Sequence, residues 1–296
     1  MSDPFFLVPV EGLHLGQKGV IMRQNLTDLT VADRDLYLSD KLCCLAFRQE
    51  EYHGAAVGIA KTFDELAAAY QLVYREYLTR GFCHPNESGM YYTFYCFLPR
   101  SRTFVFEKDR KVLGTLSLIT DTQCGLPAEA AFRDEINALR APERCLAEIS
   151  LLAFDRSLYE GEDRHLANFR KLATAFFLFK GMFDYVRSTS ITDFVIAVHP
   201  KQERLYRSFT FQKIGSPRPY RPACGNPAIA MHANIQRWHE IVPQDQGSKV
   251  YLLRETSKHG FENDFEWNTI LIRNLLQYNN ISRTAKKHLQ SHYPGL

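Results

Sequence analysis

The sequence lacks several features that would assign its chemistry directly. Its seven cysteines include no Cys-x-x-Cys pair, so we expect neither a disulfide framework nor a metal site. No apolar run reaches the roughly 18 residues that cross a membrane as a helix. A Gly-x-Ser-x-Gly motif and an evident Cys–His pair are also missing, so a covalent serine or cysteine nucleophile is not indicated.

An excess of charge of one sign is missing as well. The net charge is +3, which is too small to indicate a nucleic-acid partner but suits an acidic partner that docks on a local patch. The first residues, MSDPFFLVPVEG, do not combine a basic start with a long apolar segment, as a secretory signal does. We therefore expect a soluble, cytoplasmic protein with reduced thiols, and contact with a membrane surface is left open.

Residues 145–154, CLAEISLLAF, are the segment that carries the most information. A run this apolar is typical of a strand that is buried on both faces of a sheet. Glu148 is its one acid, and a buried carboxylate is costly unless it is paired or used. Two interpretations follow: another group satisfies Glu148, or its pKa is raised and it acts as a base near neutral pH.

The chain divides into an N-terminal extension (1–54), a central domain (55–235) and a helical C-terminal extension (236–296). Hydrophobic residues make up 45% of the chain, enough for one large core with extensions. The patterns predict strands at 57–60, 91–98, 103–107, 112–119, 145–154, 193–198, 211–215 and 226–235, and helices at 63–80, 130–140, 168–187, 201–209 and 265–280. Residues 216–227 are expected to form a loop, and the basic end after residue 281 to be loosely held.

This order predicts an α/β fold in which helices flank a mixed central sheet. The strands at 145–154 and 193–198 are joined by one crossover helix, so they should be parallel neighbours. If they splay at their carboxyl ends, a cleft opens where ligands bind in such sheets.

Several segments resemble a known family. YRSFTF at 206–211 is similar to the Tyr-x-x-x-Gly-Phe segment of GNAT acyltransferases, with Thr210 in place of the glycine. Residues 57–235 resemble the long-chain N-acyl amino acid synthases of the FeeM type, which are related to the acyl-homoserine-lactone autoinducer synthases. The matching segments are AYQLVYREYLTRGF (69–82), VLGTLSLITDTQCGLPAEAAFRDEINALR (112–140), LAEISLLAFD (146–155) and GNPAIAM (225–231). The resemblance implies a GNAT-like fold with two terminal extensions.

The resemblance also implies a reaction. Glu148 falls on the acid of the family's A-E-[IV]-[SG] strand, where it helps to take a proton from an amine that attacks an acyl thioester directly. The oxyanion donor is expected to be a backbone N–H near Leu151 or Leu152, and Tyr206 is the candidate acid for the leaving group. Autoinducer synthases read Glu-x-Ser-Arg here. Leu151 replaces that arginine, which disfavours the alternative of an acyl-lactone synthase.

The acyl donor follows from a departure from the fold's usual pattern. CoA-dependent members carry a glycine-rich turn after this strand, whereas DRSLYEGEDRHLANFRK has the single Gly161. No bound cofactor is expected, and the donor substrate is acyl-phosphopantetheine on an acyl carrier protein, with acyl-CoA as the other source. Arg156, Arg164, Arg170 and Lys171 are candidate donor-binding residues, and a solvated charged loop is the alternative.

Three further residues are candidates for binding the amino acid substrate. Asp121 and Arg140 form either a structural ion pair or a substrate contact. His199 ends the 193–198 strand on the cleft side, or is a hydrogen-bonded structural histidine. Glu135 is expected to be an exposed helix acid. A GNAT-like domain without catalysis, serving as a lipid-binding or interaction module, is the third functional alternative.

Overall fold

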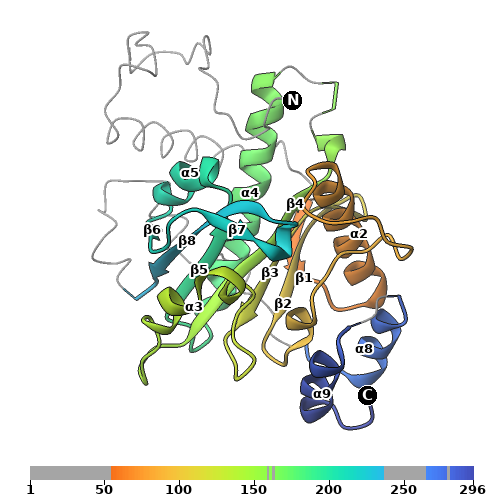
Figure 1. The fold of residues 1–296 in the computed structure, drawn as a ribbon. Helices are drawn as coiled ribbons and strands as arrows, with labels where there is room; N and C mark the ends of the chain where they lie inside the picture. Colours follow the sequence, from red (N-terminus) through yellow and green to blue (C-terminus); the bar gives the residue numbers. More distant parts are fainter. Residues whose placement is uncertain (1–54, 159, 162–163, 237–264, 279–280) are drawn as a thin grey trace.

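One sheet organises the part of the chain that the computed structural model describes, which is residues 55–158, 160–161, 164–236, 265–278 and 281–296 (Figure 1). The predicted N-terminal extension lies outside these residues. The strand order is β1-β2-β3-β4-β5-β8-β6, and β7 pairs with β8. The strands are β1 (Ala55–Ile59), β2 (Arg102–Lys108), β3 (Lys111–Thr120), β4 (Leu146–Phe154), β5 (Asp193–Val198), β6 (Gln212–Lys213), β7 (Arg218–Tyr220) and β8 (Asn226–Asn234).

The strands β1 to β4 form an antiparallel meander, and β5 joins β4 in parallel. This confirms the predicted parallel pair and its crossover helix, α4 (Arg164–Val186). The β4–β5 ladder covers only Leu146–Glu148 against Asp193–Val195. Beyond it, both strands continue without pairing to one another, as expected if they splay at their carboxyl ends.

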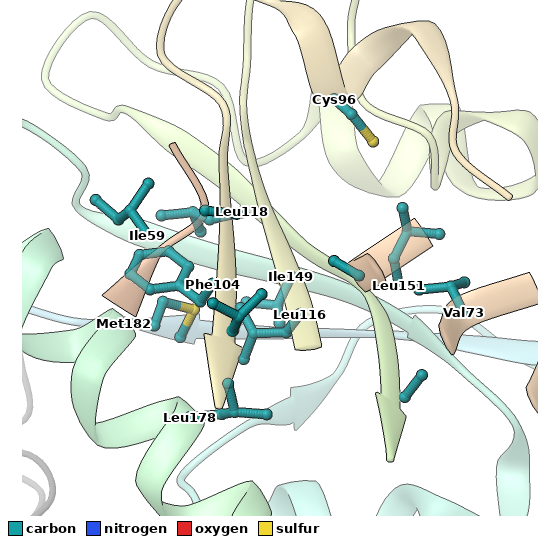
Figure 2. Close-up of a cluster of buried hydrophobic side chains, with 14 of the residues drawn as sticks. Ile59, Val73, Cys96, Phe104, Leu116, Leu118, Ile149, Leu151, Leu178 and Met182 are labelled. Carbon is teal, nitrogen blue, oxygen red and sulfur yellow. The ribbon is translucent and has the colours of Figure 1, made fainter. Parts of the chain in front are cut away.

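The helices cover both faces of the sheet (Figure 1). On one face, α2 (Phe63–Thr79) packs through Tyr70, whose hydroxyl lies 3.1 Å from Thr103 Oγ1 of β2. The next residue of β2, Phe104, points to the other face and meets Tyr185 of α4 at a ring distance of 5.5 Å. Figure 2 shows part of the core on both faces, with Met182 and Leu178 of α4 beside Phe104 and Leu116.

The start of α2 follows directly from its sequence. The Thr62 hydroxyl accepts from the backbone N–H of Glu65, and the Glu65 carboxylate accepts from the N–H of Thr62, which is the predicted capping box. The shorter α3 (Glu129–Asn137) lies on the same face of the sheet as α2 and has a break in its helical geometry at Phe132. The last helix of the central region is α5 (Glu203–Ser208), within the predicted 201–209.

Two strand and loop predictions are wrong. Residues 91–98 do not form a strand; Phe94–Phe97 is a 3₁₀-helix, because the bonds Cys96 N–H to Thr93 and Leu98 N–H to Tyr95 close short turns and the aromatic side chains pack between α2 and the C-terminal helices. Residues 218–220, predicted as loop, form β7.

The C-terminal end is better ordered than its basic composition suggests. Two helices, α8 (Thr269–Leu276) and α9 (Arg283–His292), stand beside the start of α2 (Figure 1). The Tyr92 hydroxyl donates to the carbonyl of Leu275, and the Tyr293 hydroxyl donates to the carbonyl of Phe97 at 2.8 Å. The prediction of a loosely held end is therefore wrong, because burial of Leu289 and Tyr293 anchors it. Across the described residues, no helix is both long and apolar enough to cross a membrane.

Candidate active site

Glu148 lies in the middle of the sheet, opposite Ile119 of β3 and Val195 of β5, and its side chain is 1% exposed. Its Oε2 accepts a hydrogen bond from the backbone N–H of Ala128 at 2.7 Å. Within the described ranges, no cation forms an ion pair with it, and Oε1 accepts no hydrogen bond. The structural interpretation expects a backbone amide or an arginine to satisfy Glu148, and the Ala128 amide does so for one of its two oxygens.

Burial is the main cause of a raised pKa at Glu148. It raises the pKa from its ordinary value of 4.5 to about 8. The hydrogen bond from Ala128 lowers the pKa but does not offset the loss of water, and the negative charge of Glu129 raises it further. A carboxylate with this pKa can gain or lose a proton near neutral pH.

Three tyrosines from separate elements lie within electrostatic range of Glu148. They are Tyr77 of α2, Tyr95 of the 3₁₀-helix and Tyr220 of β7. Burial raises the pKa of each hydroxyl, and the negative charge of Glu148 adds to that rise. These hydroxyls therefore stay protonated near neutral pH.

The loop between β3 and α3 brings the Ala128 amide to Glu148. Arg140, at the far end of α3, contacts both oxygens of Asp121, through Nε at 2.8 Å and Nη2 at 3.0 Å. The same guanidinium contacts Glu129, whose Oε1 also accepts from the N–H of Leu126. Asp121 and Arg140 are thus joined as an ion pair, the first of their two predicted alternatives.

The strand β4 is bulged where the oxyanion donor was predicted. Thr115 pairs with Ala153 and Ser117 with Ser150, so Leu151 and Leu152 together face the single residue Leu116. Leu151 has a φ of 54°, in the left-handed region that non-glycine residues seldom adopt. The bulge lies just beyond the end of the β4–β5 ladder, where backbone N–H groups are released from pairing with β5. The donor role of these amides stays a prediction.

The other two predicted residues follow β5. Tyr206 of α5 is buried against Phe179 and Phe211, and burial raises the pKa of its hydroxyl. His199 directly follows β5, and its Nδ1 accepts from the N–H of Lys201 at 3.2 Å, which makes it the cap of a short 3₁₀-helix. That bond fits the structural alternative for His199, and contact with a substrate is not tested by it.

A group of cations lies where β4 leads into α4. Arg156 Nε is 3.4 Å from Glu76 of α2, and Arg80 contacts the same buried carboxylate at 3.2 Å. Burial lowers the pKa of Lys171 to about 8, and the charges of Arg80 and Arg156 lower it further, against the effect of Glu76. The predicted residues Arg156 and Lys171 are therefore brought together.

Two more cations extend this group. Asp155, at the end of β4, pairs with Arg75 at 3.0 Å and with Lys111 at 3.3 Å. Arg164 and Arg170 belong to the first turns of α4, and their side chains lie outside the described part of the structure. We call Arg75, Arg80, Lys111, Arg156 and Lys171 the basic cluster; it surrounds Glu76 and Asp155.

Sequence reasoning missed most partners of Glu148. Ala128 acts through its main chain, which no side-chain motif reveals. Glu129 follows a Gly-Leu-Pro turn, and its position there was the only available signal. Glu135 was predicted to be an exposed acid, but it forms an ion pair with Arg218 of β7. That prediction is wrong because residues 218–220 form a strand, which brings Arg218 to Glu135.

In the described residues, no group of three or more His, Cys, Asp or Glu side chains could hold a metal ion.

Comparison with known proteins gives a consistent assignment. The family model for the N-acyl amino acid synthase FeeM matches residues 68–234. The solved structure of FeeM, an N-acyl amino acid synthase from uncultured soil microbes, aligns with 28% identity and a TM-score of 0.51, over 63% of this chain and 93% of that one. The autoinducer synthase LasI aligns with 15% identity and a TM-score of 0.48, over 68% of this chain and 96% of its own. A search of curated proteins found no match.

The family model covers more than half of the chain. The protein therefore belongs to the FeeM family of N-acyl amino acid synthases and is an acyltransferase with a GNAT-type fold.

Proposed function

We propose that the protein joins a long-chain acyl group, delivered by an acyl carrier protein, to the α-amine of an amino acid. The observation that carries this proposal is the state of Glu148. Its carboxyl group is buried, has a pKa of about 8 and has one hydrogen bond, so it exchanges its proton near neutral pH, and its ionised form can take a proton from the amine. An acid with a purely structural role would need a closer set of partners to offset its burial.

The reaction is a direct displacement. The neutral amine attacks the thioester carbonyl carbon, a C–N bond forms and the carbonyl oxygen becomes negative. Glu148 takes a proton from the nitrogen, through Oε1 or a bridging water. An amide N–H of Leu151 or Leu152 stabilises the oxyanion. The C–S bond then breaks, and Tyr206 protonates the departing thiolate; its raised pKa keeps it in the protonated form that this step requires.

The choice of donor rests on the loop after β4. Its single Gly161 gives it little of the backbone freedom with which a glycine-rich turn holds a pyrophosphate. The basic cluster instead offers positive charge on four elements: α2, the β2–β3 hairpin, the segment after β4, and α4. Such an arrangement suits the single phosphate of phosphopantetheine and the acidic surface of a carrier protein. Arg164 and Arg170 would add to it.

The acceptor is proposed from the relative. The solved FeeM structure is described as an N-acyl amino acid synthase, and an amino acid supplies the amine that Glu148 would deprotonate. To contact the acceptor, His199 would have to give up its bond from Lys201 N–H, and Asp121 and Arg140 would have to open their ion pair.

One experiment tests the proposal. The purified protein is incubated with long-chain acyl-carrier protein or acyl-CoA and a pool of amino acids, and products are identified by mass spectrometry. We expect N-acyl amino acids, formed faster from the carrier protein. Glu148→Gln should lower kcat/KM by at least about 100-fold, while Glu160→Gln, which changes an exposed acid, should not. Acyl-homoserine lactones as products, or full activity in Glu148→Gln, would overturn the proposal.

A further inference from the structure

The loop from Asp121 to Glu129 is closed on itself by one arginine. The Arg140 guanidinium contacts both oxygens of Asp121 at one end of the loop and Glu129 at the other. Arg140 also contacts the side chain of Asn137. A planar guanidinium that is held by two carboxylates at once fixes the distance between them. The ends of the loop are therefore tied, and the Ala128 amide lies inside the tied segment.

The backbone conformation of this loop leaves room for the Glu129 carboxylate that Arg140 contacts. Gly125 has a φ of 73°, and a Cβ on it would lie 2.5 Å from Glu129 Oε1. Only glycine leaves room for the Glu129 carboxylate to fold over the turn and accept from Leu126 N–H at 2.9 Å. At the other end, the Asp121 N–H donates to the carbonyl of Leu146, which anchors the loop to β4 two residues before Glu148.

A second arginine, Arg133, also contacts Glu129 but does not join it to Asp121. Arg133 reaches the other oxygen of Glu129 at 3.8 Å, and its side chain is 72% exposed. It makes one long contact to one carboxylate and none to Asp121 among the described residues. Arg140 is 31% exposed and has both partners, so the two arginines differ in function although they share Glu129.

We propose that Arg140 is a positioning residue, which acts through Asp121 and Glu129 to hold the Ala128 amide against the Glu148 carboxylate. This inference rests on the proposed function of Glu148. It also assigns Arg140 away from the substrate, because the guanidinium is already committed to two carboxylates.

The charges near Glu148 decide whether loss of Arg140 raises or lowers the pKa of Glu148. The groups within electrostatic range of it are Tyr77 of α2, Tyr95 of the 3₁₀-helix, Tyr220 of β7 and Glu129 of α3, and of these only Glu129 is an acid. Loss of Arg140 would remove the closer of the two cations that contact Glu129, and it would release the amide that stabilises the ionised form of Glu148. Both changes favour the protonated form of Glu148, so the base would become active only at higher pH.

The test compares Arg140→Gln with the matched control Arg133→Gln. We expect the acid limb of the kcat/KM–pH profile to move up by about one pH unit in Arg140→Gln, with about tenfold lower kcat/KM at pH 7 and recovery by about pH 10. The Arg133→Gln profile should coincide with that of the wild type. A uniform loss at all pH values, with a raised KM for the amino acid, would instead make Arg140 a substrate ligand and overturn the inference.

A second measurement does not depend on activity. Carboxyl ¹³C NMR of protein labelled at glutamate identifies the Glu148 resonance by its loss in Glu148→Gln, and its titration is followed in each variant. The midpoint should rise in Arg140→Gln and also in Gly125→Ala, where the added Cβ displaces Glu129. An unchanged midpoint in both variants would refute the inference. Absence of any acyl transfer by the wild type would refute the proposed function alone.

Discussion

Replacement of Glu148 by glutamine should make the protein more stable, by an amount that grows with pH. In the folded protein, burial raises the pKa of this carboxyl from 4.5 to about 8. Below pH 4.5 the group is protonated in both the folded and the unfolded chain, and it adds no pH dependence. Between pH 4.5 and about pH 8 the unfolded chain has lost this proton and the folded chain keeps it. The free energy of unfolding therefore falls as pH rises through this range. Above about pH 8 both are ionised, and the difference stays constant.

The expected magnitude is large for one side chain. One pKa unit corresponds to 1.36 kcal/mol, so the full difference approaches about 5 kcal/mol, and the part between pH 5 and pH 7 is about 3 kcal/mol. Glutamine has nearly the same shape and can still accept from Ala128 N–H, but it does not ionise. The gain of Glu148→Gln over the wild type should therefore increase by about 3 kcal/mol over these two pH units.

Urea unfolding at pH 5, 6, 7 and 8 measures this directly. Subtraction of the wild-type curve from the Glu148→Gln curve removes the contribution of every other titrating group, provided that it is the same in both proteins. The exposed acid Glu160, changed to glutamine, provides the control for the substitution itself. Parallel curves for Glu148→Gln and the wild type would show that the carboxyl is ionised in the folded protein at neutral pH, and the reasoning about its role would fail.

Three further outcomes follow from the same structure. The value of kcat/KM should rise about tenfold from pH 7 to pH 9, as Glu148 ionises around pH 8, and a profile flat over this range would exclude it as the base. Gly215→Ala should destabilise the fold by about 1–3 kcal/mol in urea unfolding, because its Cβ would lie 2.6 Å from the Phe132 ring, whereas Gly58→Ala meets no atom within 4 Å and should not be destabilised in this way. Arg156→Gln should raise KM for an acyl-carrier protein several-fold at low salt and less at high salt, since exposed charges are screened; an unchanged KM would remove it from the donor site.

The central part of the fold, the parallel pair β4 and β5 with its crossover helix, could be predicted from the sequence. The apolar runs at β4 and β5 and the periodic helix between them leave little choice but a parallel pair with one crossover. The aromatic residues at 91–98 predict a strand, because aromatic residues favour strands in general. Their rings instead pack against Trp267 and His288, which lie far away in the sequence. Tertiary packing decided that segment, and no local pattern could show it.

The site was predictable only where a side chain acts through its own chemistry. Glu148 stood out because an acid in an apolar strand is rare. The Ala128 amide could not be found, because any residue supplies a backbone N–H. Arg140 and Asp121 were noticed, but whether they bind each other or a substrate depends on the loop geometry, which depends on Gly125. Spacing along the chain does not contain that information.

The hydroxyls of Tyr92 and Tyr293, which donate to main-chain carbonyls far away in the sequence, have a consequence for how the chain folds. Tyr92 and Leu275 are 183 residues apart, and Phe97 and Tyr293 are 196 apart. During synthesis, the segment between α2 and β2 therefore emerges from the ribosome long before its partners in α8 and α9 exist. Contacts of such range form late, since closing a long chain segment costs entropy before any contact repays it. A protein truncated before α8 would leave the Tyr92 hydroxyl and the Phe94 ring without their C-terminal partners, and a folding intermediate of the full chain should expose the same surface.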